Sequence, residues 1–154
     1  MLERLLRSKE EWAPVIIRLM LAVVIFPHGA QKLLGWFGGY GFTGTMGYFT
    51  ETVGLPWIVG FLVILIEFFV PFLLAAGLFS RIAALSVFGL FTGIVLNSHI
   101  QLGFFMNWYG QLEAGLEGFE YHLLVLAMAG ALMVAGGGKH ALDRYVLNKY
   151  ALEA

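Results

Sequence analysis

The sequence contains no cysteine and few charged residues. The absence of cysteine from all 154 residues excludes disulfide frameworks, thiolate metal sites, iron–sulfur clusters and thiol redox chemistry. Charged residues make up 12% of the chain, about half of the roughly 25% that is usual in soluble domains. The 9 basic and 10 acidic residues leave no basic surface for nucleic acid. These shortages argue against a soluble enzyme, a disordered chain and a nucleic-acid-binding protein.

Apolar residues take the place of the missing charges, at 60% of the chain and a mean hydropathy of +0.83. They gather in four segments, which cover about residues 14–34, 55–78, 81–99 and 119–135. A helix needs about 20 apolar residues to cross a bilayer core of about 30 Å. The sequence therefore predicts one all-α domain over residues 1–154, an integral membrane bundle of four transmembrane helices.

The basic residues predict the orientation of these helices. Seven of the nine flank the same ends of the predicted helices: Arg4, Arg7, Lys9, Arg81, Lys139, Arg144 and Lys149. The short connections on the other side carry no cation after Lys32, and such loops are normally exported. We therefore expect a multi-pass protein of the cytoplasmic (inner) membrane with both termini in the cytoplasm.

The first exported connection, Gly35–Gly54, combines seven glycines with six aromatic residues. It is too aromatic for a solvated linker. One interpretation is a loop folded onto the bundle, with a short interfacial helix near Thr45–Val53. The other is a lid that covers a ligand entrance together with the second exported loop, Gly103–Gly118. The sequence leaves both open.

Several ionisable side chains fall within the apolar segments or at their ends, where each costs about 2.5–3.5 kcal/mol unless it is paired or hydrated. They are Arg18, His28, Lys32, Glu67, His99, Glu120 and His122. The helical rise of about 1.5 Å per residue places most of them at one level in the exported half, with Glu67 just below and Arg18 deeper.

Each of these residues has a structural and a functional interpretation. Arg18 and Glu67 are predicted to form a structural ion pair. A single buried histidine usually just finds a hydrogen-bond partner, but the whole set is hard to ascribe to packing. We therefore predict a polar pocket at the exported half of the bundle. In it, Glu67 and Glu120 transfer protons, and a cofactor is bound by His28, Lys32, His99 and His122.

Three kinds of ligand suit such a pocket. Imidazole and carboxylate groups can hydrogen-bond the ring oxygens of a quinone and exchange protons with it. The same groups ligate non-haem metals, although no two of these histidines share one helix face at the i, i+3 or i+4 spacing. Haem b held by two histidines is the third, since no CxxCH motif is present for covalent haem. Quinone is the leading expectation.

An ordered set of residues resembles the DoxX family of small four-helix membrane proteins. The set comprises Arg18, His28-Gly29-x-x-Lys32, Gly54-Leu55-Pro56, Glu67, Gly77-Leu78-Phe79-Ser80-Arg81, Glu120 and the glycine run before Asp143. The resemblance runs from about Val15 to Asp143. It implies association with quinol oxidases, thiosulfate:quinone oxidoreductases or membrane-bound detoxification systems. A thiosulfate-oxidising role would need another subunit, because no thiol is present.

Two further interpretations stay open. The chain could be a non-catalytic accessory or assembly protein whose polar residues only hold the helices together. It could also provide a small-molecule or proton pathway, for which the polar residues stop too early on the cytoplasmic side. The expected partners are the lipid bilayer, quinone, and further subunits or a second copy of the chain.

Overall fold

The computed structural model describes Leu6, residues 10–113 and residues 116–152 of the chain. Within these residues the fold is helical and contains no strand. The principal helices are α2 (Ala13–Leu34), α3 (Gly41–Gly47), α4 (Trp57–Ala76), α5 (Ser80–Ile94), α6 (Glu120–Ala135) and α7 (Leu142–Leu152). The cations Arg4, Arg7 and Lys9, used above to predict the orientation, lie outside the described residues.

Three helical stretches among the described residues are long and apolar enough to cross a membrane: Ala13–Leu34, Trp57–Ala76 and Ser80–Leu102. The third consists of α5, continued by the π-helical segment η3 (Val95–His99) and the 3-10 turn η4 (Ile100–Leu102). Helix α6 is apolar but has only 16 residues. Its length of about 24 Å falls short of a bilayer core. The protein is therefore an all-α, multi-pass membrane protein with three long spans and one shorter apolar helix.

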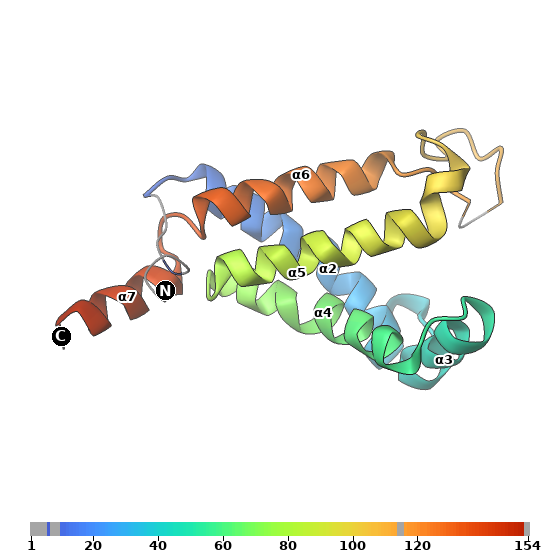
Figure 1. Cartoon of the computed structure of the whole chain (residues 1–154), viewed down its shortest axis with the longest axis horizontal. Coiled ribbons are helices and arrows are strands. Elements are labelled where there is room, and N and C mark those ends of the chain that lie inside the picture. Colours follow the sequence, from blue (N-terminus) through green and yellow to red (C-terminus); the bar gives the residue numbers. More distant parts are fainter. Residues whose placement is uncertain (1–5, 7–9, 114–115, 153–154) are drawn as a thin grey trace.

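The long helices lie side by side along the longest axis of the molecule (Figure 1). Helix α3 and the loop that precedes α6 lie at one end of the bundle, and α7 lies at the other end, near the start of α2 (Figure 1). The two connections predicted to be exported therefore share one end. Their orientation across a membrane remains a prediction.

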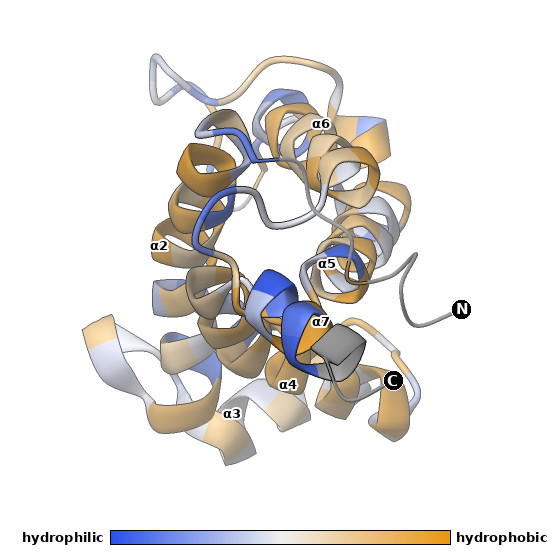
Figure 2. Cartoon of the chain, turned by 90° about the vertical axis from the view of Figure 1, so that its left-hand side faces the viewer, coloured by the Kyte–Doolittle hydropathy of each residue, from blue (hydrophilic) through white to orange (hydrophobic). Residues whose placement is uncertain are grey.

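Apolar side chains cover the outside of the bundle as well as its interior. Leu21 and Ile25 of α2, Leu74 of α4 and Val125 of α6 are fully buried or nearly so. Large apolar side chains such as Val23, 68% exposed, point outward from the same helices. Figure 2 shows hydrophobic colour around the helices, with hydrophilic residues gathered on α7. Helices that are apolar on all faces are expected in lipid.

The ends of the helices follow local sequence signals. Gly35 ends α2 and Gly77 ends α4, each in the left-handed conformation with φ of 74° and 67°. Glycine adopts that conformation without steric cost. A short helix was expected near Thr45–Val53, and helical structure is present there as α3 and the π-helical segment η2 (Tyr48–Thr52), beginning at Gly41. Its place at the membrane interface stays a prediction. Helix α7 was not predicted.

Candidate functional site

An ion pair joins the last turn of α2 to the middle of α4. The Lys32 ammonium lies 2.5 Å from a carboxylate oxygen of Glu67. The Glu67 side chain is 5% exposed and that of Lys32 is 25% exposed. A carboxylate at this depth needs such a partner, because an isolated charge in an apolar interior is very costly.

The pair depends on a close approach of the two helix backbones at Gly29. A Cβ atom at this position would overlap the backbone carbonyl of Glu67 and the backbone nitrogen of Phe68. Only glycine leaves that space free, so α4 can lie directly against α2 at this level. Lys32 is three residues further along α2, close enough to reach back to Glu67.

The structure gives Arg18 and Glu67 different partners, in place of the ion pair expected between them. Arg18 donates hydrogen bonds to the backbone carbonyls of Leu74, at 2.9 Å, and Ala75. The reason is the antiparallel register of α2 and α4. Since Gly29 lies opposite Glu67, Arg18 lies about three helical turns away, opposite the carboxyl end of α4. A cation is favourable there because the last carbonyls of a helix carry partial negative charge.

A cavity of about 230 Å³ lies beside the ion pair, between α2, α4, α5 with η3, and α6. Its lining combines polar and apolar side chains: Ile25, His28, Lys32, Glu67, Phe91, Ile94, His99, Tyr121 and His122. Five of the side chains singled out in the sequence thus line one cavity: His28, Lys32, Glu67, His99 and His122.

Two of the histidines in this cavity are in ring contact. The ring centroids of His99 and His122 are 4.3 Å apart, with 39° between the planes. His99 Nδ1 lies 2.6 Å from the carbonyl oxygen of Glu117, which can only accept, so Nδ1 carries the proton and donates. His122 Nδ1 is buried and has no hydrogen-bond partner among the described residues. An unpartnered buried nitrogen beside a cavity is a position where a ligand or water can bind.

Glu120 lies apart from the other predicted site residues. Its carboxylate accepts hydrogen bonds from the backbone N–H of Met106 at 3.2 Å and the Trp108 indole at 3.1 Å. It is not among the residues that line the cavity. The first residue of α6 thus holds the loop before it in place, because several donors of that loop converge on one carboxylate.

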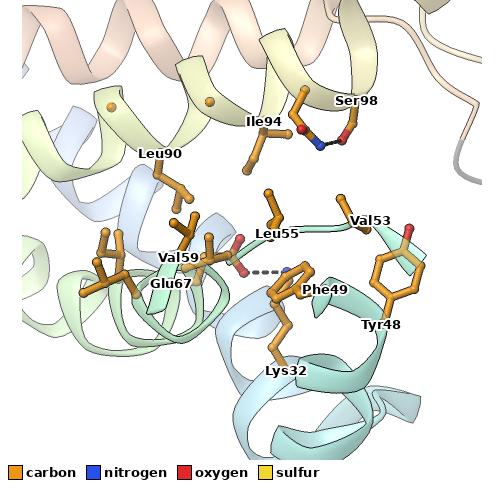
Figure 3. A pocket seen from close by; sticks show the side chains of 16 residues that line it. Lys32, Tyr48, Phe49, Val53, Leu55, Val59, Glu67, Leu90, Ile94 and Ser98 are labelled. Atoms are coloured by element: carbon orange, nitrogen blue, oxygen red, sulfur yellow. Dashed lines mark hydrogen bonds and ion pairs between the residues drawn. The ribbon is translucent and has the colours of Figure 1, made fainter. Parts of the chain in front are cut away.

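A second and larger cavity, of about 430 Å³, lies on the other side of the ion pair. We call it the α4–α5 groove, since Val59, Leu62, Val63 and Ile66 of α4 face Gly89, Leu90, Gly93 and Ile94 of α5. The remaining lining residues are Asn97 and Ser98 of η3, Tyr48, Phe49 and Val53 of the first connection, Leu55 directly after it, and the paired Lys32 and Glu67. Figure 3 shows the ion pair between these walls, with Leu90, Ile94 and Ser98 opposite Val59.

The first connection covers only part of this region. Tyr48 and Phe49 line the α4–α5 groove. Trp36 and Phe37, also predicted to close the pocket, are 53% and 66% exposed. The lid interpretation therefore finds support in the second half of the connection and not in the first.

The described residues contain no group of three or more histidine, aspartate or glutamate side chains that could together hold a metal ion. Haem b does not fit between His99 and His122, because their rings are already in contact and leave no space for a macrocycle.

Two features of the site were missed by sequence reasoning. The groove depends on Gly89 and Gly93, and their spacing of four residues on one helix face was the available signal. The second is the role of Asp143, which the family resemblance included without a function. Asp143 is fully buried and accepts hydrogen bonds from the backbone N–H groups of Phe79 at 2.6 Å and Ser80 at 2.9 Å. It thereby fastens α7 to the amino end of α5.

The model of the DoxX family matches residues 13–108, more than half of the chain. No curated protein and no solved structure matches the chain. The matched region contains Lys32, Glu67 and His99, whereas Glu120 and His122 follow it. The chain belongs to the DoxX family.

Proposed function

We propose that this DoxX family protein is a quinone-binding membrane subunit of an oxidoreductase system. In this proposal α2, α4, the α5–η4 stretch and α6 cross the cytoplasmic membrane in turn, with both termini in the cytoplasm. The quinone ring lies at the Lys32–Glu67 pair, in the half of the bundle nearer the exported loops.

The observation that carries this proposal is the place of the ion pair between two cavities of different chemistry. One is the apolar α4–α5 groove, and the other is the histidine-lined cavity. Ligand sites are typically apolar cavities of about 300–1,000 Å³ with a few polar groups that orient the ligand. A buried ion pair that only held helices together would not need a cavity on either side.

The side chains suit the two carbonyl oxygens of a quinone. The Lys32 ammonium donates to one of them. Asn97 and Ser98, which line the same groove, supply a donor for the other. Aromatic and apolar neighbours such as Phe49 cover the ring faces.

Reduction of a quinone to a quinol takes up two electrons and two protons. Glu67 is the proton-transferring group nearest the ring. The cavity lined by His28, His99 and His122 provides the path for protons between Glu67 and the exported side. Glu120 serves as the proton acceptor nearest the exported loops. The electrons come from a redox subunit that docks on this one.

The binding step is tested with the purified protein in quinone-free nanodiscs. A short-tailed benzoquinone is titrated against the wild type and the Lys32→Met/Glu67→Gln double variant, with tryptophan quenching as the readout. Loss of hydrogen bonds to a charged group, about 1.5–3 kcal/mol, predicts binding weaker by about tenfold or more. Lys139→Met, on the far end of the bundle, is the control and should bind as the wild type does. Equal affinity in all three proteins would contradict the proposal.

The accessory-protein function is the second candidate, and a specific observation favours it. Arg18 and Asp143 both bind backbone groups at helix ends rather than a cavity. These two buried charged residues therefore stabilise the fold and do not contribute to a ligand site. If the wild type binds no quinone and the double variant assembles normally, the accessory function stands.

A further inference from the structure

The α4–α5 groove is open to the membrane phase along one side. Gly89 and Gly93 of α5 are exposed, and a Cβ atom added to either would meet no atom within 4 Å. Val59 and Leu62 of α4, also in the groove, are 39% and 47% exposed. The groove between α4 and α5 is therefore left open at these two glycines, where a larger side chain would fill it.

The inner end of the groove is polar but carries no net charge. Lys32 is the cation there and it is paired with Glu67. A phospholipid headgroup would bring a phosphate, and with it an uncompensated negative charge beside Glu67. The groove therefore suits an apolar chain that ends in a neutral head with hydrogen-bond acceptors.

Resting on the function proposed above, we propose that the α4–α5 groove holds the isoprenoid tail of a long-chain quinone that arrives sideways from the bilayer. The ring then lies at the Lys32–Glu67 pair and the first isoprene units run between α4 and α5. Gly89 and Gly93 are the specificity determinants, because any larger side chain occupies the path of the tail.

Two substitutions of the same kind test this proposal. Gly93→Leu fills the groove, whereas Gly130→Leu places the same side chain on α6, where a Cβ atom meets only Phe88 at 3.9 Å. Both replace glycine in a helical segment with a better helix former, so neither variant is expected to unfold. Circular dichroism of each variant checks this.

The probes are two benzoquinones with the same ring, one with a single isoprene unit and one with eight. Both are titrated in phosphatidylcholine nanodiscs, with affinity expressed as mole fraction in the bilayer. We expect Gly93→Leu to weaken binding of the eight-unit probe by about tenfold or more and to leave the one-unit probe nearly unchanged. Gly130→Leu should change neither. The same loss for both probes, or none for either, would overturn the proposal.

Failure of this inference differs from failure of the proposed function. If the wild type binds neither probe, the quinone function itself is wrong. If both probes bind and Gly93→Leu does not discriminate between them, the ring site stands but the tail lies elsewhere. Displacement of both probes by added phosphatidylglycerol would overturn the inference too, because it would make the groove a site for phospholipid.

Discussion

Replacing both members of the Lys32–Glu67 pair should cost the bundle less than replacing either one. The Glu67 side chain is 5% exposed and Lys32 lies 2.5 Å from it, so Lys32→Met leaves a carboxylate in an apolar interior. Removal of one partner of a buried pair typically costs about 3–5 kcal/mol. Since the Lys32 side chain is 25% exposed and the pair is not fully enclosed, we expect about 2–4 kcal/mol for each single variant.

The double variant Lys32→Met/Glu67→Gln leaves no charge without a partner. Its loss should be smaller than the sum of the single losses, with a coupling energy of about 1–3 kcal/mol. The assay is reversible unfolding in mixed micelles of a denaturing and a mild detergent, followed by circular dichroism.

The exposed pair of Arg144 with Glu10, 3.1 Å apart, provides the control. Its members have side chains that are 32% and 66% exposed, so the corresponding cycle should show a much weaker coupling than that of Lys32 and Glu67. Additive losses at Lys32 and Glu67 would refute a direct electrostatic contribution and, with it, the geometry on which the site is built.

Four other outcomes are expected. Gly29→Ala should destabilise the bundle by about 1–3 kcal/mol and weaken quinone binding, because its Cβ overlaps the Glu67 backbone, while Gly89→Ala should be neutral in detergent unfolding. Asp143→Ala removes the acceptor for two buried backbone N–H groups and should cost about 2–3 kcal/mol in the same assay, and Asp143→Asn about half as much. A reporter active only in the cytoplasm should work at the C-terminus and fail within Gly35–Gly54; the reverse result would invert the proposed topology. Hydrogen bonding from Arg144, then its charge, lowers the pKa of Glu10, so the stability that this pair adds should be present above the ordinary pKa of a glutamate and fade as the pH falls. In Arg144→Gln, a titration followed by NMR should show the Glu10 pKa rising.

The helices could be predicted from the sequence because their signals are local. Runs of apolar residues give the spans: α2 and α6 end before Gly35 and Gly136, as expected, and α4 ends before Gly77, two residues short of the predicted end. Helix α7 was missed because it is amphipathic and short, and Asp143, its anchor, contacts residues more than 60 positions away. No local pattern encodes such a contact.

The candidate site could be predicted only in part, since depth along a helix is local information but register between helices is not. The rise per residue brought His28, His99 and His122 to one level, and they line one cavity. The same estimate of depth suggested a pair between Arg18 and Glu67, because it contains no information on where α2 and α4 contact each other. That contact is fixed by Gly29, and it places Lys32 rather than Arg18 beside Glu67.

The α4–α5 groove could not be predicted because both of its walls are apolar on every face. In a soluble protein, the polar side of a helix shows which side is buried, whereas in a membrane protein that contrast is absent. Gly89 and Gly93 could equally have marked a tight helix contact, which is the usual role of small residues in membrane helices. The structure shows space beside them instead.

The partners of the buried charges separate structural from functional residues in this bundle. Arg18 binds the carboxyl end of α4, Arg81 donates to the Met133 carbonyl near the end of α6, and Asp143 binds the amino end of α5. Each charge thus meets helix-end groups of opposite partial charge, an arrangement that stabilises the bundle without any ligand. Lys32, in the last turn of α2, and Glu67, in the middle of α4, meet side chain to side chain, with a cavity on both sides. Glu67 lies far from either end of α4, so no end of that helix compensates its charge, which is why the search for a ligand begins there.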